Sequence, residues 1–410
     1  MYISSLAVLA LATVSVSAQQ LCNGYAEFCN KHYNSLTYLL THNAYGYVAN
    51  PASNQACPIP TQLTDGVRGL KLSAIRSSNA TTAGTDANSI QLCHTSCTIL
   101  NGGSAVDTLT KITEWVKANP NEVVTIMWNN LGNFTPTAFE AAYNASGLTD
   151  YVHTQAYGNL TWPTLGEMIS SGKRVVNFVD EGTDTHQVAW LLPEWDFCFE
   201  TPYNNKNESS FSCTIDRPTE PNDPTESLYI MNHFLYGTLR LGALEIEIPQ
   251  KGTANVTNGN SSLLAQAQQC KSTFGRQPTF LEIDFYNKGN TLEIAAALNN
   301  VSYTRPSQLQ CDVYEATAST GGSGSSSDAS TLMYSSTVLL SLVATVFFTY
   351  MSTFSKNLFD VLGDGEVPRP AAPVKEEAAP VVIDKKNVAK INKDGIDQKI
   401  FHLAARASKG

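Results

Sequence analysis

The sequence is poor in basic residues. Lysine and arginine number 26 against 36 aspartates and glutamates, which gives a formal net charge of -10 at pH 7. Residues 352–410 hold ten basic and eight acidic residues, so the rest of the chain stands at 16 minus 28, or -12. An acidic main body argues against nucleic acid as its partner, because nucleic-acid phosphates attract basic surfaces.

The chain also lacks several short motifs that define large enzyme classes. It contains no Walker-type phosphate loop, no G-x-S-x-G elbow, no H-E-x-x-H pair and no clustered Cys/His metal spacing. These absences exclude the nucleotide hydrolases, serine hydrolases and zinc proteins that such motifs mark.

Features of export are present at the N-terminus. An apolar run ends at Val16-Ser17-Ala18, a small-x-small pattern that predicts a signal peptide over residues 1–18, although no Lys or Arg precedes it. A short membrane anchor is the alternative. Export predicts disulfides among nine cysteines, of which one must stay unpaired or pair with another chain. Sequence proximity favours Cys22–Cys29, Cys198–Cys213 and Cys270–Cys311, with Cys57, Cys93 and Cys97 competing for one further bridge. Eight N-x-S/T sequons, all before residue 301, predict a glycoprotein.

The C-terminal part changes character. A Gly/Ser-rich linker over residues 315–331 precedes an uncharged apolar segment at 332–351, which is long enough for a transmembrane helix or for a glycolipid-anchor signal. A Pro/Ala/charge-rich tail follows at 352–410 and predicts disorder. Residues 351–375 resemble the N-terminus of fungal ribosome-associated proteins of the hyaluronan/mRNA-binding type, which favours the hypothesis that the tail is a gene-model fusion. The main domain would then be extracellular and held at the membrane through the apolar segment.

Residues 22–311 predict one α/β domain. Short, continuous apolar runs are typical of strands buried on both faces of a parallel sheet, and eight occur: SLTYLLTHNA, GVRGLKLSA, SIQLCHT, EVVTIMWNN, RVVNFVD, WDFCFE, SLYIMNHF and TFLEIDFY. Helical patterns lie between several of them, including residues 104–120 with an apolar stripe and 135–147 between a Pro and a Gly. Eight strands in one domain predict a TIM-type β/α barrel. A doubly wound open sheet is the alternative.

Two histidines and one aspartate lie where predicted strands end. His42 follows the first strand, His94 the third, and Asp284 ends the last, which closes next to the first. Reactive groups collect at the C-terminal ends of barrel strands. Two imidazoles at one mouth can act as base and acid, with a carboxylate orienting one of them. A structural role is the alternative for any single histidine.

These segments together resemble a known family. The stretches LTHNAYG, QLTDGVRGLKL, IQLCHTSC, WVKANPNEVVTIMW, GKRVVNFVDEG, LYIMNHFLY and FLEIDFYN resemble the phosphatidylinositol-specific phospholipase C X-domain superfamily, in particular its secreted fungal members, from about Tyr33 to Asn300. The resemblance implies a phosphoric diester hydrolase acting on a phospholipid or other phosphodiester. It implies that His42 is the general base and His94 the general acid. Asp284 would hold the tautomer of His42, and Asn43 would touch the phosphoryl group or a metal.

The chain departs from the family at the positions of the calcium ligands. Lys71 and Ser73 replace two acidic ligands on the second strand, and Asn129 replaces another on the fourth. Calcium prefers six to eight oxygens, several of them anionic, so we expect no metal or other cofactor. Metal-independent bacterial relatives place an Arg where Ser73 stands. Lys71 could supply the missing charge to the phosphoryl oxygens, or it could reach solvent as an inert lysine.

Further polar and aromatic residues are weaker candidates. Asp180 follows the RVVNFV strand and Tyr286 the last strand, and either could bind substrate or serve the structure alone. The sequence thus predicts a phospholipase C-type enzyme acting on phosphatidylinositol-like lipids. The alternative is a catalytically weak cell-surface binding protein that keeps the same barrel.

Overall fold

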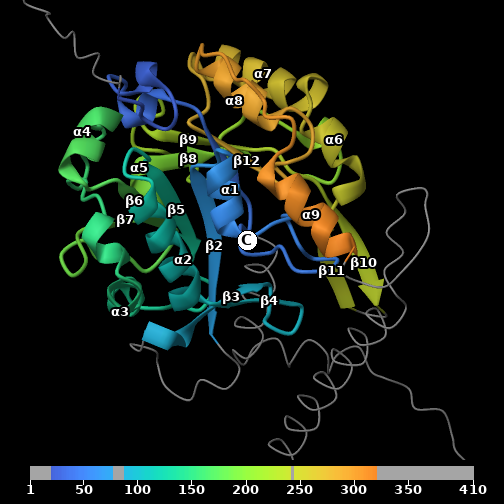
Figure 1. Ribbon diagram of the computed structural model, residues 1–410, viewed down its shortest axis with the longest axis horizontal. Coiled ribbons are helices and arrows are strands. Elements are labelled where there is room, and N and C mark those ends of the chain that lie inside the picture. Colours follow the sequence, from blue (N-terminus) through green and yellow to red (C-terminus); the bar gives the residue numbers. More distant parts are fainter. Residues whose placement is uncertain (1–19, 77–86, 242–243, 321–410) are drawn as a thin grey trace, which may run out of the picture.

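The computed structural model describes residues 20–76, 87–241 and 244–320. Helices surround a curled parallel sheet, and an antiparallel hairpin projects beside α9 (Gln310–Thr320) (Figure 1). The signal peptide at 1–18, the segment at 332–351 and the tail at 352–410 lie outside the described residues. Among the residues that are described, no helix combines the length and the apolar character that crossing a bilayer requires.

Eight parallel strands form the main sheet, in the order β7-β6-β5-β2-β1-β12-β9-β8. Their bounds are β1 Tyr38–Thr41, β2 Gly69–Arg76, β5 Val124–Asn129, β6 Val175–Val179, β7 Leu191–Pro193, β8 Cys198–Glu200, β9 Leu228–Asn232 and β12 Phe280–Ile283. The order places the first and last strands side by side at the centre. This α/β barrel-type architecture confirms the predicted fold class. In the described part of the chain no ladder joins β7 to β8, so the barrel is open between them.

One predicted barrel strand is instead an antiparallel extension. β3 (Ile90–His94) pairs antiparallel with the end of β2 and with β4 (Leu100–Ser104). Its apolar run resembles those of the barrel strands, so the sequence does not distinguish it from them. The eighth barrel strand is β7, whose three residues are too few to show a pattern in the sequence. A separate hairpin, β10 (Tyr236–Leu241) with β11 (Leu244–Pro249), follows β9.

Helices connect the strands as the sequence patterns predict. α2 (Ala105–Ala118) begins after Ser104, whose side chain caps the Val106 amide, and it buries Leu109, Ile112 and Val116. α3 (Pro136–Ser146) has proline at its start and ends at Gly147, whose φ of 75° suits glycine. The other helices are α1 Ile59–Asp65, α4 Leu165–Ser171, α5 Glu194–Phe197, α6 Ala254–Thr257, α7 Ala265–Phe274, α8 Thr291–Leu298 and α9 Gln310–Thr320.

The inward face of the sheet changes from apolar to polar along the strands. Side chains alternate between the two faces of a strand, so residues two apart share a face. The inward apolar residues form a core cluster of their own, separate from the cluster between the sheet and the outer helices. Toward the C-terminal strand ends, Leu40 is followed on this face by His42, Met127 by Asn129, Ile230 by Asn232, and Phe280 by Glu282. The polar site therefore lies on an apolar floor.

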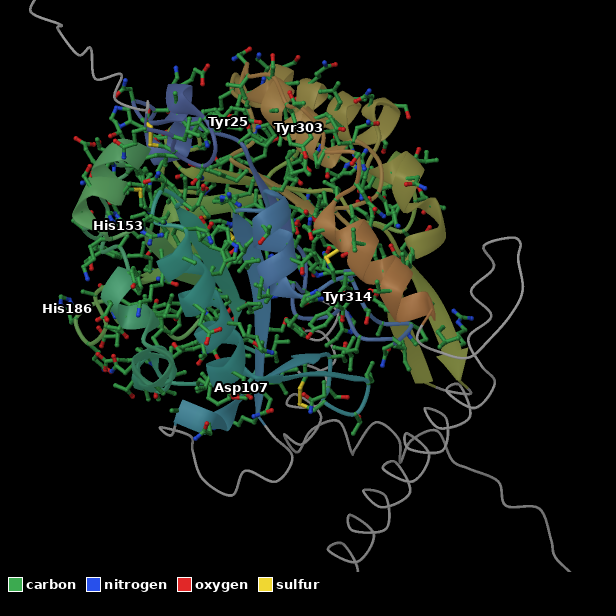
Figure 2. The ribbon with its side chains drawn as sticks, viewed as in Figure 1. Tyr25, Asp107, His153, His186, Tyr303 and Tyr314 are labelled. Carbon is green, nitrogen blue, oxygen red and sulfur yellow. A yellow bond between two sulfur atoms is a disulfide. The ribbon has the colours of Figure 1, made fainter. Side chains whose placement is uncertain are left out.

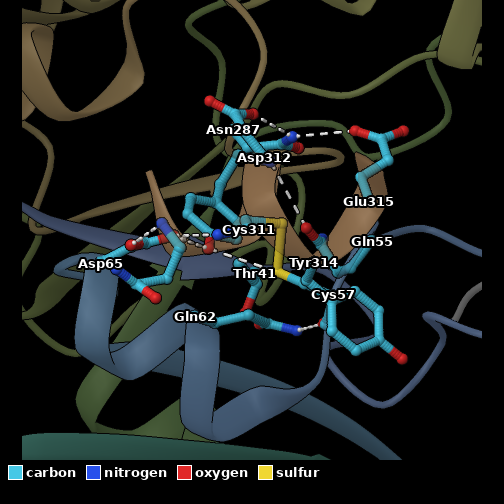
Figure 3. Close-up of a disulfide and its surroundings, with 12 residues drawn as sticks. Thr41, Gln55, Cys57, Gln62, Asp65, Asn287, Cys311, Asp312, Tyr314 and Glu315 are labelled. Carbon is cyan, nitrogen blue, oxygen red and sulfur yellow. Dashed lines mark hydrogen bonds between the residues drawn. A yellow bond between two sulfur atoms is a disulfide. The ribbon is translucent and has the colours of Figure 1, made fainter. Parts of the chain in front are cut away.

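Four disulfides hold the described residues. Cys22–Cys29 confirms the prediction, whereas Cys213 pairs with Cys270 and Cys311 with Cys57, so two predicted pairs are wrong. Cys93 pairs with Cys97. Cys198 begins β8 in the core and is a free, buried thiol. Proximity in sequence did not predict these pairs, because the pairing of β1 with β12 brings distant parts of the chain together. The Cα atoms of Cys57 and Cys311 are 5.4 Å apart (Figure 3).

Candidate active site

His42 and Asp284 meet because β1 and β12 are neighbours. Thr41 pairs with Ile283 in the parallel ladder, so the residues that follow them, His42 and Asp284, lie side by side at the end of the two strands. The His42 Nδ1 lies 3.0 Å from the Asp284 Oδ1, and both residues are buried. Burial lowers the pKa of His42, but the Asp284 charge and hydrogen bond outweigh it, so the pKa of His42 is raised.

Two asparagines complete the surroundings of this imidazole. The Asn54 amide donates to the Asp284 Oδ1 at 2.9 Å. The Asn43 Nδ2 lies 3.1 Å from the His42 Nε2, and the Asn43 Oδ1 accepts from the hydroxyls of Tyr45 and Ser73. Because its oxygen faces two donors, Asn43 presents its amide N–H to Nε2. This arrangement favours the ring with its proton on Nδ1 and a lone pair on Nε2.

His94 is the last residue of β3, which runs antiparallel to the end of β2. A tight turn follows it, with Thr95 at a φ of 58° and the Cys93–Cys97 disulfide closing the loop. Burial, with a smaller contribution from the His42 charge, lowers the pKa of His94 to about 4. His94 is therefore a neutral imidazole near neutral pH in this state.

Both histidines line one small cavity. The cavity measures about 20 Å³ and is also lined by Asn54, Tyr203, Phe234, Tyr236, Glu247, Pro249 and Asp284. Asp284 and the two rings thus face a common space, although His94 comes from the antiparallel strand β3 and not from a barrel strand. The histidines are only 5% and 8% exposed, which makes the site narrow in this state.

Lys71 lies inside the barrel mouth. Its Nζ is 2.7 Å from the Glu194 Oε1, and both side chains are at most 3% exposed. Burial lowers the pKa of Lys71, but Glu194, Glu282 and Glu200 raise it well above its ordinary value, so the ammonium stays charged. The expectation of an inert lysine reaching solvent is therefore wrong. Lys71, Asn129 and His42 line a second cavity of about 10 Å³ beside the first.

The donor set around Lys71 does not fit a calcium ion. The Lys71 ammonium already pairs with the Glu194 carboxylate, and it would repel a divalent cation at the same place. Within the described ranges, no three His, Cys, Asp or Glu side chains group as metal ligands.

Two functional candidates carried no signal in the sequence. Phe234 stacks on His42 with ring centroids 4.1 Å apart. Arg217 pairs with Glu200, and its guanidinium lies 4.5 Å from the Tyr203 ring centre and 5.0 Å from that of Trp195. Both Phe234 and Arg217 line the second cavity. Arg217 belongs to the long connection between β8 and β9, where no periodic pattern marks a site residue.

Two predicted substrate-binding residues lie elsewhere. The Tyr286 hydroxyl donates to the Asp65 Oδ2 at 2.6 Å, and Asp65 in turn accepts from the backbone amides at the start of α9. Tyr286 lines neither cavity. The Asp180 Oδ1 accepts from the Asn130 amide at 2.7 Å, and burial raises the pKa of Asp180 to about 6. Neither side chain lines the cavities with His42. The structure places them in supporting positions, and substrate contact by either residue stays a prediction.

The other described histidines lie apart from the cavities. His153 and the exposed His186 lie toward the edge of the molecule (Figure 2). His233 is fully buried, with the Gln266 side chain and the Thr257 carbonyl as partners of its two ring nitrogens. Burial lowers the pKa of His233 to about 4, as expected for a structural imidazole. The pair His42 and His94 is thus distinguished by facing a common cavity.

Known proteins are similar in sequence to this domain. The family described as PI-PLC X 1 matches residues 28–299. A protein of Arthroderma benhamiae named "PI-PLC X domain-containing protein 1" is 33% identical over 309 residues, which is 72% of this chain and 96% of that protein. An "Uncharacterized secreted protein" of the same organism is 36% identical over 296 residues, which is 69% of this chain and 64% of the relative's length.

Solved structures of bacterial enzymes are more distant. A mutant of the phosphatidylinositol-specific phospholipase C from Staphylococcus aureus aligns with 13% identity and a TM-score of 0.44, over 70% of this chain and 94% of that one. The enzyme of the same name from Listeria monocytogenes aligns with 14% identity and a TM-score of 0.43, over 67% and 96%. The sequence match over more than half of the chain decides the assignment: this chain belongs to the PI-PLC X domain family.

Proposed function

We propose that the protein is a phosphoric diester hydrolase of the phospholipase C type, acting on phosphatidylinositol-like lipids. The observation that supports this most directly is that His42, bound to Asp284, and His94 line one cavity. Two imidazoles around one reacting centre supply the base and acid that diester cleavage needs. Membership of the family supports the substrate class.

In the proposed reaction, a headgroup hydroxyl next to the phosphate attacks phosphorus. The His42 Nε2 takes the hydroxyl proton as the new oxygen–phosphorus bond forms. His94 gives a proton to the leaving alkoxide as the old bond breaks. Asp284 keeps the His42 proton on Nδ1 and stabilises the imidazolium that results. The substrate hydroxyl would replace the Asn43 amide at Nε2.

The protonation of His94 needs the substrate. Burial holds the pKa of His94 at about 4, so without a bound anion this acid would be unprotonated near neutral pH. An anionic diester bound beside the ring favours its charged form and raises this pKa. Lys71, fixed by Glu194, adds positive charge near the phosphoryl oxygens without a metal.

We infer that the protein acts outside the cell. Four disulfides in the described residues and a relative named as a secreted protein support export. The apolar segment at 332–351 would tether the domain to the membrane, near lipid substrates.

A noncatalytic binding protein is the second candidate. One observation favours it: the cavity shared by the two histidines is only about 20 Å³, far below the roughly 300 Å³ of ordinary ligand sites. Hydrolysis of phosphatidylinositol by the purified protein in the presence of a chelator separates the two. Turnover that is lost in both His42→Ala and His94→Ala supports the enzyme, whereas no turnover of any diester by the folded protein supports the binding protein.

A further inference from the structure

A large groove adjoins the catalytic cavity. It measures about 730 Å³, within the range of roughly 300–1,000 Å³ that is usual for small-molecule sites. Its walls are the loop 47–56, the chain at 248–252 at the base of the hairpin, and one face of α9. Pro249 lines both this α9 groove and the cavity of His42 and His94, so the two spaces are neighbours.

The three walls of the α9 groove are fastened to one another. The Cys57–Cys311 disulfide joins the end of the loop to the start of α9 (Figure 3). The Lys251 Nζ lies 2.8 Å from the Glu315 Oε1, which ties the hairpin base to α9. The Tyr47 and Tyr314 rings meet edge to face at 6.3 Å. The groove is therefore formed before any ligand arrives, which lowers the cost of binding.

Most polar side chains of the groove are engaged by the protein itself. The Asn50 amide donates to the Ile99 carbonyl, and the Gln250 amide donates to the Lys206 carbonyl. The Gln55 amide donates to the His42 carbonyl at 3.0 Å, and the charge of Lys251 is balanced by Glu315. A sugar chain needs donors and acceptors that face it, and these amides offer few. The lining instead suits an apolar, uncharged ligand.

Two large apolar side chains that are exposed to solvent line this groove. The large hydrophobic residues that are exposed in the described ranges are Leu21, Val48, Tyr157, Val256, Val313 and Tyr314. Val48 and Tyr314 line the groove at 41% and 37% exposure, and Val313 precedes Tyr314 on α9. Tyr314 is labelled beside α9 in Figure 2, and its ring meets that of Tyr47 in the loop. Apolar groups left in water around a preformed concavity mark a binding site.

We propose that the α9 groove binds one acyl chain of a lipid whose phosphate lies between His42 and His94. The link to the phosphate rests on the proposed function, whereas binding of the chain does not. Because both spaces share Pro249 as a lining residue, the groove lies next to the cavity, which favours a chain attached to the substrate. The groove then favours lipids from which one acyl chain can move out of the bilayer. After cleavage it holds that chain of the released acylglycerol.

Binding of single alkyl chains tests the site without any headgroup. The probe is dansyl-undecanoic acid, displaced by monoalkylglycerols of 8, 10 and 12 carbons, on the full-length protein and on its His42→Ala variant. Affinity should rise about fourfold per added methylene, the value for burial of a CH₂ group, and should be equal in both proteins. Affinity that does not depend on chain length, or displacement by oligosaccharides instead, overturns the proposal.

A matched pair of substitutions on α9 locates the site. Ala318 lines the groove and Ala316 does not, and both are exposed on the same helix. Ala318→Trp should fill the groove and weaken probe binding at least tenfold, whereas Ala316→Trp should leave it unchanged. Equal binding by the two variants overturns the site.

Substrates of different chain length separate this proposal from the proposed function. Ala318→Trp should raise KM for long-chain phosphatidylinositol while hydrolysis of a soluble glycerophosphoinositol diester stays the same. If the wild type does not hydrolyse the soluble diester, only the catalytic proposal is contradicted, because the probe still measures binding of the chain. Equal KM values for wild type and Ala318→Trp on the long-chain lipid overturn the acyl-chain site.

Discussion

The Nδ1 of His42 lies 3.0 Å from the Oδ1 of Asp284, although 242 positions separate the two residues in the chain. The parallel pairing of β1 with β12 creates this contact, because it brings the next residue of each strand to the same edge. The carboxylate fixes the tautomer, and the lone pair of Nε2 faces the Asn43 amide. This geometry suits the role of general base that we propose for His42.

Asp284→Asn should lower kcat at least about 100-fold, at the lower end of the effect of a positioned acid–base group. The amide removes the charge that stabilises the imidazolium, and it no longer selects the Nδ1–H tautomer. Rates on phosphatidylinositol measure the effect. Asp107→Asn, at an exposed position in the first turn of α2 (Figure 2), is the matched control and should keep full activity. Similar rates for both variants would contradict the role of Asp284.

The dependence of kcat/KM on pH should be bell-shaped. Catalysis needs one proton shared by the two rings. The acid limb should therefore lie near the His94 pKa of about 4, below which both rings are charged. The alkaline limb should lie above the ordinary histidine value of 6.5, because Asp284 raises the pKa of His42 and the last proton leaves there.

Rates on a soluble diester between pH 3.5 and 9 check this profile, with tryptophan fluorescence as the control for folding. Asp284→Asn should move the alkaline limb to lower pH, since it removes the charge that raises the pKa of His42. A profile with a single limb, or an alkaline limb that stays in place in Asp284→Asn, would refute the shared-proton account.

The fold could be predicted from the sequence because strands buried on both faces leave continuous apolar runs. Seven of the predicted runs contain barrel strands, and Leu109, Ile112 and Val116 mark α2 correctly. The direction of β3 could not be predicted, since an apolar run carries no information on whether its partner is parallel. Nor could β7, which has only three residues.

The site was predictable only where it follows strand ends. His42, His94 and Asp284 lie at such positions, and the structure brings them together. Arg217 and Phe234 come from irregular chain, where only tertiary packing decides which side chains reach the cavity. The Lys71 partner, Glu194, lies 123 positions away, and no local pattern connects them.

Lys71→Met should destabilise the protein by about 3–5 kcal/mol, because it leaves the Glu194 carboxylate buried without its partner. Lys71→Met/Glu194→Gln should recover much of this loss, since the remaining charge is removed as well. Free energies of unfolding in urea measure both effects. The exposed pair Arg305–Glu293 offers the control, because Arg305→Met should cost at most about 1 kcal/mol. A double variant as unstable as Lys71→Met would contradict this account.

Removing the Cys57–Cys311 disulfide should lower both stability and activity. The bond closes 254 positions of chain, and its loss in Cys57→Ser/Cys311→Ser should cost about 2–5 kcal/mol. Cys57 ends the segment that carries Asn54 and Gln55, and Gln62 ties its carbonyl to β1 through Thr41 (Figure 3). Looser anchoring of this segment should displace the His42–Asp284 pair and lower kcat/KM about tenfold, since a shift of 1 Å can cost up to about 100-fold.

The short disulfide at the N-terminus is the control for this prediction. Cys22–Cys29 closes only seven positions, and neither residue lines either cavity with His42. Cys22→Ser/Cys29→Ser should therefore lose less stability and keep the wild-type kcat/KM. Urea unfolding and rates on a soluble diester, measured under conditions where each variant is fully folded, compare the two. Equal activities of the two double variants would show that the Cys57–Cys311 bond stabilises the fold without positioning His42.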